Sequence, residues 1–315
     1  MNSSEYILGI DVGGTKILAG LVDKTGSVLT QNIYSMNASE QKSIESSIQY
    51  AVHDFISRLS QPPSLMGIGL VGAVDTENGI WVGAINIPVK ESIPMAERFY
   101  TKYGFQVRLD NDVHCAALAE AKFGEHRDSK LFVYLNIGTG ISLAIIHQGM
   151  VIHGAGNYAG EIGHMVVDET PNICKCGRRG CIEPYVSGGG LRSRALEIAE
   201  KHPQSIFAAQ VMRQDFTAGL LYQMANDGDP HASMLVSKSR EMLLNASVNL
   251  VNLINPEWIV FGGGALDREW LLGDYLRLLK KKSLPASSAS LRGISFSTLD
   301  PRQVGMVGAA SLWID

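Results

Sequence analysis

Apolar strands and glycine turns alternate in the same order at two places in the chain. Residues 7–29 read ILGIDVGGTKILAGLVDKTGSVL, and residues 133–152 read VYLNIGTGISLAIIHQGMVI. In each segment an apolar strand ends in a polar residue, and a glycine-threonine turn, a second strand, a glycine turn and a third short strand follow. We interpret the two segments as copies of one β-meander, one copy in each domain. Chance similarity between two glycine-rich hairpins is the alternative.

Helical periodicity occupies much of the remaining chain. In residues 43–59 apolar side chains recur at spacings of three and four, and Pro62-Pro63 ends the run. Similar patterns predict helices over residues 94–103, 112–123, 189–201, 204–214, 217–226, 230–254 and 305–313, and strands over residues 66–71, 107–109 and 258–261. Mixed strands and helices with duplicated halves predict an α/β protein with a cleft between two lobes.

Composition excludes several classes of protein. The 315 residues are 45% hydrophobic and 18% charged, which is typical of a globular protein, and the net charge of −4 argues against nonspecific binding of nucleic acid. No apolar run reaches the roughly 18 residues of a membrane helix, and the N-terminus lacks the pattern of a signal peptide. We therefore expect a cytoplasmic protein that binds neither nucleic acid nor membranes.

The turn DVGGTK, residues 11–16, predicts a phosphate site. Adjacent glycines leave backbone N–H groups free to surround a phosphate, and Thr15 and Lys16 add a hydroxyl and a charge. The pattern is neither a Walker loop nor a Rossmann fingerprint, because a strand follows the glycines. A plain hairpin turn is the alternative, but the second turn at residues 138–140 could grip the same polyphosphate. Asp11, beside the first turn, is placed to hold Mg²⁺ through water.

Taken together, the motifs resemble those of the ROK family of sugar kinases, which has the actin-like/hexokinase ATPase (ribonuclease H-like) fold. They are DVGGTK, LDNDVHCAALAE, LNIGTG, AGEIGH with CKCGRRGC, and FGGG, in this order over residues 7 to 313. We accordingly expect a two-lobed protein, with a small lobe of residues 1–115 and about 303–315 and a large lobe of residues 116–302. The resemblance also implies a homodimer.

The resemblance assigns residues to ATP and to the sugar. It implies that the ATP phosphates contact Gly13, Gly14, Thr15, Gly138, Thr139 and Gly140, and that the wall against the adenosine is Gly262, Gly263 and Gly264. It implies that the sugar is bound by Asn86, Asn111, Glu161, His164 and Glu183.

Asp112 stands where a predicted strand meets a predicted helix. A helix N-terminus favours the ionised carboxylate, which could take a proton from a sugar hydroxyl during attack on the γ-phosphate. A helix cap is the alternative role, and both roles can hold together. The resemblance implies that Asp112 is the general base. On the same helix we interpret His114 and Cys115 as structural residues, and we assign no role to His153.

Three cysteines, Cys174, Cys176 and Cys181, lie within eight residues, and His164 precedes them by ten. One histidine and three thiolates fill the tetrahedral shell of a structural Zn²⁺, leaving no position for a catalytic water. Reduced cysteines in a plain loop are the alternative; the resemblance agrees with zinc. His164 would bind zinc through one ring nitrogen and a sugar hydroxyl through the other.

These patterns together predict an ATP-dependent kinase for the 6-hydroxyl of glucose or an N-acetylhexosamine. A sugar-responsive ROK transcription regulator is the other class considered. Such regulators carry a helix-turn-helix domain ahead of the first glycine turn, and only ten residues precede Asp11 in this sequence. We therefore expect the enzyme.

Overall fold

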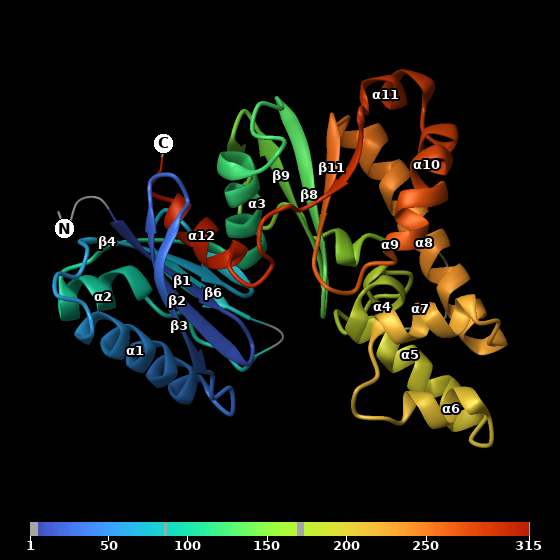
Figure 1. Ribbon diagram of the computed structural model, residues 1–315, viewed down its shortest axis with the longest axis horizontal. Coiled ribbons are helices and arrows are strands. Elements are labelled where there is room, and N and C mark those ends of the chain that lie inside the picture. The colour runs from blue at the N-terminus through green and yellow to red at the C-terminus, as the bar shows by residue number, and fades with distance from the viewer. Residues whose placement is uncertain (1–5, 85–86, 169–172, 315) are drawn as a thin grey trace. The chain divides into compact units, whose positions relative to one another are not determined.

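Two five-stranded sheets of the same topology form the framework (Figure 1). The computed structural model describes residues 6–84, 87–168 and 173–314. In the first sheet β1 (Tyr6–Val12), β2 (Lys16–Asp23) and β3 (Val28–Ser35) form an antiparallel meander, and β4 (Leu65–Leu70) and β7 (Gln106–Asn111) extend it in parallel from β1. In the second sheet β8 (Leu131–Ile137), β9 (Ile141–His147) and β10 (Met150–Val151) repeat the meander, and β11 (Trp258–Gly262) and β12 (Gly293–Phe296) extend it from β8. The predicted duplication is confirmed, but not with one copy in each domain, because β10 and most of β9 belong to the same compact unit as the first meander.

The chain forms two compact units. The first comprises Met1–Lys130, Ala144–Ala159 and Ser297–Asp315, and the second comprises Leu131–Leu143 and Gly160–Phe296. The first unit contains the residues expected for the small lobe and, in addition, residues 116–130, 144–159 and 297–302.

Helices cover both faces of the sheet in the first unit. Because successive side chains of a strand point to opposite faces, Leu8 of β1 packs in the core with α1 (Gln41–Ser57) and α2 (Met95–Tyr103), whereas Ile7 packs with α12 (Val304–Ser311) and α3 (Asp112–Phe123). The predicted helices at residues 43–59, 94–103, 112–123 and 305–313 are confirmed, with shifts of two residues or fewer at their ends.

Helix α12 lies unusually close to its neighbours, and glycines make this approach possible. A Cβ atom at Gly67 of β4 would lie 1.8 Å from the carbonyl oxygen of Ala309, and one at Gly308 would lie 1.8 Å from the carbonyl oxygen of Cys115 on α3. Any larger side chain at these positions would have to displace backbone.

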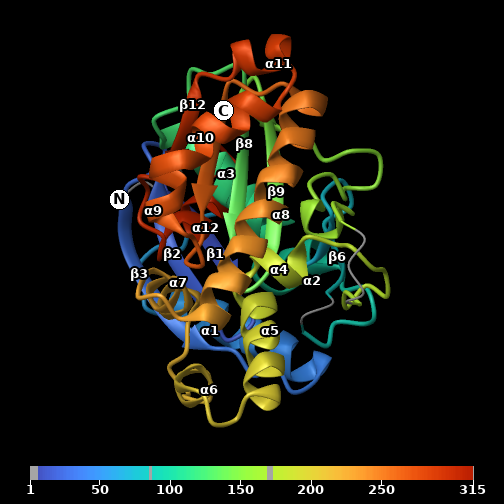
Figure 2. The same ribbon diagram turned by 90° about the vertical axis from the view of Figure 1, so that its right-hand side faces the viewer.

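The second unit is organised around the long helix α8 (Pro230–Ile254), which contacts α4 (Glu183–Val186), α5 (Gly188–Lys201), α7 (Ala218–Asn226), α10 (Leu276–Lys282) and α11 (Pro285–Ser290) (Figure 2). The short helix α6 (Ile206–Val211) follows α5. The helices predicted over residues 189–201, 204–214, 217–226 and 230–254 are confirmed, the second of them as a shorter helix.

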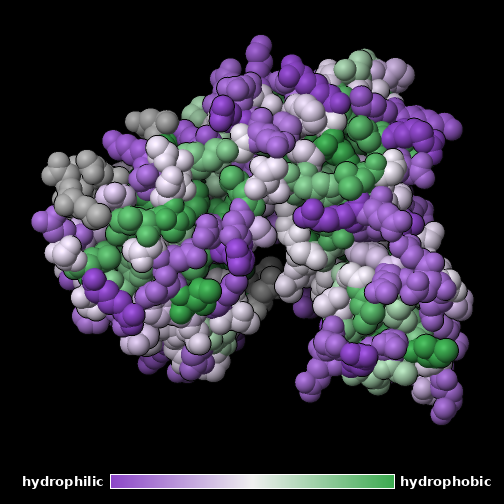
Figure 3. Space-filling model, in the orientation of Figure 1, coloured by the Kyte–Doolittle hydropathy of each residue, from purple (hydrophilic) through white to green (hydrophobic). Residues whose placement is uncertain are grey.

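Several short elements escaped the sequence patterns. They are the hairpin of β5 (Ala73–Asp75) and β6 (Ile80–Gly83), the helical run of α9 (Arg268–Trp270), η2 (Leu271–Tyr275), α10 and α11, and the strand β12. Hydrophilic and hydrophobic residues are interspersed over the face seen in Figure 3. Within the described ranges, no helix has both the length and the apolar character needed to cross a membrane.

Candidate functional site

The two glycine-threonine turns join the first two strands of each meander. In the first, the Gly13 N–H donates to the Lys16 carbonyl at 3.0 Å, and Gly14 and Thr15 lie exposed at the tip. In the second, the Gly138 N–H donates to the Gly140 carbonyl at 2.9 Å. Both turns are closed hairpins, each within its own unit, and they are called the first and second phosphate turns after the role predicted for them.

Two carboxylates lie next to the first turn, in the first unit. Burial raises the pKa of Asp11 to about 6, although the charge of Lys16 acts in the opposite direction. Burial and, as a smaller effect, the negative charge of Asp11 together raise the pKa of Asp112 to about 7. A pair of desolvated carboxylates is a donor set that suits a divalent cation, and Asp11 could therefore hold Mg²⁺.

Helix α3 begins at Asp112, but its cap is the preceding residue. Asn111 Oδ1 accepts the N–H groups of Val113 at 2.9 Å and His114 at 3.3 Å, and Asn111 Nδ2 donates to the Gly72 carbonyl at 3.0 Å. The alternative role of Asp112 as the helix cap was therefore wrong, because an amide already fills that position. Asp112 occupies the first helical position, where its Oδ1 accepts the adjacent Val113 N–H at 3.0 Å.

The second unit carries three of the predicted sugar ligands. Glu161 precedes the 3₁₀ turn η1 (Ile162–His164), and Oε2 of Glu161 lies 3.9 Å from Nε2 of His164. Glu183 begins α4, and a Cβ atom at either Gly140 or Gly163 would lie 3.3 Å from its Oε2. Glu183 therefore lies between η1 and the second phosphate turn. A fourth predicted ligand, Asn86, lies outside the described residues, and the fifth, Asn111, caps α3 in the first unit.

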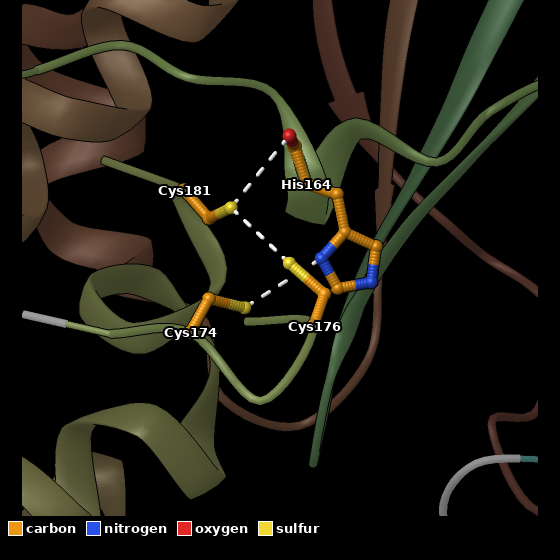
Figure 4. A group of neighbouring side chains, drawn as sticks. All are labelled: His164, Cys174, Cys176 and Cys181. Atoms are coloured by element: carbon orange, nitrogen blue, oxygen red, sulfur yellow. Dashed lines mark hydrogen bonds between the residues drawn. The ribbon is translucent and has the colours of Figure 1, made fainter. Parts of the chain in front are cut away.

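His164 and the three clustered cysteines converge on one point (Figure 4). Sγ of Cys174 lies 3.6 Å from Nδ1 of His164, and Sγ of Cys176 lies 3.7 Å from Sγ of Cys181. Ligands of a tetrahedral Zn²⁺, bound at about 2.3 Å for sulfur and about 2.1 Å for nitrogen, lie about 3.8 Å (S–S) and about 3.6 Å (S–N) apart. The observed spacing fits this shell, so these four residues could hold Zn²⁺.

The glycines after β11 lie against the end of β8. The Ala265 N–H donates to the Ile137 carbonyl at 2.9 Å, and Gly263, at φ +90°, would bring a Cβ atom to 2.2 Å from the same oxygen. Gly262, Gly263 and Gly264, which are predicted to form a wall of the nucleotide site, therefore lie close to the second phosphate turn.

The start of α5 also contacts the second turn, which sequence analysis missed. The N–H groups of Gly188 and Gly189 donate to the carbonyls of Gly138 at 2.8 Å and Thr139 at 3.0 Å. The available signal was Ser187 followed by three glycines at a helix start. A second omission is the group formed by Asp110, His114 and His153, which no spacing in the sequence indicates.

Comparison with known proteins places this arrangement in a family. The model of the ROK family matches residues 7–315. The chain belongs to the ROK family. It is 28% identical to a glucokinase of Thermotoga maritima over 313 residues, which cover 97% of this chain and 96% of that protein.

Two solved ROK structures extend the comparison. One is a Streptomyces griseus ROK glucokinase in complex with glucose and AMPPNP, with a TM-score of 0.75, 27% identity, and coverage of 98% of both chains. The other is a ROK transcriptional regulator homologous to the E. coli MLC protein, with a TM-score of 0.84, 25% identity, and coverage of 98% of this chain and 77% of that one. The predicted actin-like ATPase fold class is thereby confirmed.

Proposed function

We propose that this ROK protein is an ATP-dependent sugar kinase that phosphorylates a hexose. The acceptor is most simply the 6-hydroxyl of glucose or of an N-acetylhexosamine. One observation carries the proposal: the carboxylate of Asp112, at the start of α3, has a pKa raised to about 7. Asp112 lies in the same unit as the phosphate turn at Gly13 and Gly14, and the charge of Asp11, beside that turn, contributes to the raised pKa. The similarity to glucokinases over nearly the whole chain supports the same activity.

Asp112 would act as the general base. As the sugar oxygen forms a bond to the γ-phosphorus of ATP, the bond from that phosphorus to the β–γ bridging oxygen breaks, and the hydroxyl proton passes to the Asp112 carboxylate. A carboxylate whose pKa has been raised toward 7 is a stronger base than an ordinary aspartate and remains substantially ionised at neutral pH. Asn111 supports this role, because it caps α3 by accepting the N–H groups of Val113 and His114, so Asp112 is not needed as the cap.

The sugar would be oriented from the second unit. Glu161, the Nε2 side of His164, and Glu183 supply two carboxylates and an imidazole, which suit pairs of sugar hydroxyls. The gap of 3.9 Å between Glu161 Oε2 and His164 Nε2 exceeds a hydrogen bond, so each atom can take a hydroxyl instead of the other.

Two metals fit this scheme. Asp11 would hold Mg²⁺, which supplies charge neutralisation for the ATP phosphates when bound. Zn²⁺ on Cys174, Cys176, Cys181 and Nδ1 of His164 would fix the imidazole ring and its tautomer, so that Nε2 is presented to the sugar.

The similarity to a ROK transcriptional regulator favours a second candidate, a protein that binds the sugar as a signal. A single assay separates the two. A panel of glucose, N-acetylglucosamine, N-acetylmannosamine and allose is tested for sugar-dependent ADP release in a coupled assay. Turnover with one or more sugars supports the kinase, whereas sugar binding without ADP release from any of them contradicts it.

A further inference from the structure

A buried carboxylate in the first unit is engaged by donors on both of its oxygens. The Asp110 side chain is 3% exposed, and its Oδ1 accepts the Asn111 N–H at 2.7 Å and lies 2.9 Å from Nδ1 of His114. Its Oδ2 lies 2.7 Å from Nε2 of His153, which comes 43 residues later in the chain. Burial alone would raise the pKa of Asp110, but the hydrogen bonds of His114 and His153 outweigh burial and keep the pKa below its usual range.

The two imidazoles hold the two ends of one loop, residues 153–159. His153 begins the loop, and Nε2 of His114 lies 3.4 Å from the carbonyl oxygen of Ala159, its last residue. The loop also closes on itself, because the Ala159 N–H donates to the His153 carbonyl at 3.0 Å. Asp110 is therefore connected to both ends of the 153–159 loop, directly at one end and through His114 at the other.

Within the part of the chain that the structure describes, the side chains of the 153–159 loop contribute little buried surface. Residues 154–159 are Gly, Ala, Gly, Asn, Tyr and Ala, none of them is buried, and Tyr158 is 57% exposed. Gly154 and Asn157 have positive φ angles of 73° and 62°. A loop with small, exposed side chains gains little from apolar packing, so its hydrogen bonds have a large share in holding it.

This loop leads directly into a predicted sugar ligand. After Ala159 the chain enters the second unit at Gly160, whose φ is +99° and whose carbonyl accepts the Leu143 N–H at 2.9 Å. Glu161 follows at once. At the other end of the network, Asp110 is followed by Asn111 and by Asp112. Asp110 and the 153–159 loop thus closely precede, in sequence, the two residues that the proposed mechanism uses as base and sugar ligand, Asp112 and Glu161.

We propose that His153 is a positioning residue for sugar binding, which holds the 153–159 loop to Asp110 and thereby sets the conformation in which the chain reaches Glu161. This inference rests on the proposed kinase function, because Glu161 is there a sugar ligand. His153 does not itself touch substrate. Its loss weakens sugar binding through the loop, while the ATP turns, which are separate segments, keep their affinity.

The test compares four proteins: wild type, His153→Ala, His153→Gln, and the control His147→Ala, which removes an exposed histidine at the end of β9 in the same unit. Two readouts are taken from each protein. Hydrogen–deuterium exchange of the peptide spanning residues 152–160 shows whether His153 holds the loop to Asp110, which we call the tether, and it does not depend on activity. The KM values for sugar and for ATP report its consequence.

In His153→Ala, exchange in residues 152–160 is expected to rise about tenfold, and the sugar KM about tenfold, as loss of one charge-assisted hydrogen bond would give. The ATP KM should stay within about twofold. His153→Gln retains an N–H donor and should recover part of both effects, and the control should match wild type. Adding Asp110→Asn to His153→Ala should raise the sugar KM no further than Asp110→Asn does alone, because His153 acts through its hydrogen bond to Asp110.

Unchanged exchange in His153→Ala would overturn the tether, and faster exchange with an unchanged sugar KM would overturn the positioning role. Equal increases in the KM values for sugar and ATP would also overturn it, since they indicate a general loss of structure. A wild-type protein that turns over no sugar at all would contradict the proposed function and, with it, the positioning role in sugar binding. The exchange data would still show whether His153 holds the 153–159 loop to Asp110.

Discussion

Nδ1 of His164 lies 3.6 Å from Sγ of Cys174, while Nε2 of the same ring lies 3.9 Å from Oε2 of Glu161. One imidazole therefore faces a group of thiols on one side and a carboxylate on the other. If the thiols hold a metal ion, the ring cannot turn, and Nε2 remains directed toward Glu161, the proposed sugar ligand. The metal and sugar sites are then linked through one side chain.

Removal of zinc should weaken sugar binding selectively. We expect about one zinc per chain by atomic absorption in the purified protein, and a sugar KM raised about tenfold after chelation, with the ATP KM nearly unchanged. Replacing zinc should restore the sugar KM. A chelated protein that contains no zinc and retains the original sugar KM would contradict the link through His164.

Close packing of α12 can be tested at Gly308. A Cβ atom there would lie 1.8 Å from the carbonyl oxygen of Cys115, so Gly308→Ala must displace the backbone of α3 or α12. We expect a loss of stability of about 1–3 kcal/mol, measured as a lowered Tm. The matched control is Gly273→Ala, where a Cβ atom meets nothing within 4 Å. Equal Tm values for the two variants would argue against the tight contact.

The ion pair between His153 and Asp110 should make stability depend on pH. The Asp110 hydrogen bond raises the pKa of His153 above 6.5, despite the opposing effect of partial burial. A raised histidine pKa contributes stability that is fully present below pH 6.5 and is lost as the pH rises through the higher pKa of the folded state. The pKa of Asp110 is lowered below 3.8, so its contribution is present above pH 3.8 and is lost in stronger acid.

The difference in Tm between wild type and His153→Gln should therefore be largest between about pH 4 and pH 6.5, and should shrink toward pH 9. The expected loss at its maximum is of order 1 kcal/mol, because His153 is partly exposed to solvent. A difference that grows from pH 6 to pH 9 would show that the sign is wrong.

Sequence patterns predicted elements well where local chemistry marks their ends. Helix α3 was predicted with the bounds it has, from Asp112 to Phe123, although the residue that caps its start is Asn111 and not Asp112. The hairpin of β5 and β6 was missed because strands of three and four residues are too short to show a period of two. The helical run at residues 268–290 is broken into pieces, including the π-helical turn η2, so it lacks one continuous helical period.

The site residues also divide into those that a local sequence pattern marks and those that only the fold brings together. The two glycine-threonine turns and the cysteine cluster are each compact in sequence, so local patterns could locate them, and the roles proposed for them remain predictions. The Asp110 network could not be found in this way, because its pairing of residues 110 and 153 arises only when β7 and the 153–159 loop come together in the fold. Asp112 could be located from sequence, but its raised pKa could not, since burial and the nearby Asp11 charge cause it.

The central claim is that Asp112 is the base of a sugar kinase, and Asp112→Asn tests it most directly. The variant keeps a side chain of the same size, but an amide cannot accept the hydroxyl proton. The control is Asp128→Asn, because the side chain of Asp128 is 94% exposed. The account predicts that kcat for sugar-dependent ADP formation falls at least about 10²-fold in Asp112→Asn, while sugar affinity stays within about threefold and the control equals wild type. Turnover by Asp112→Asn near the wild-type rate would contradict it.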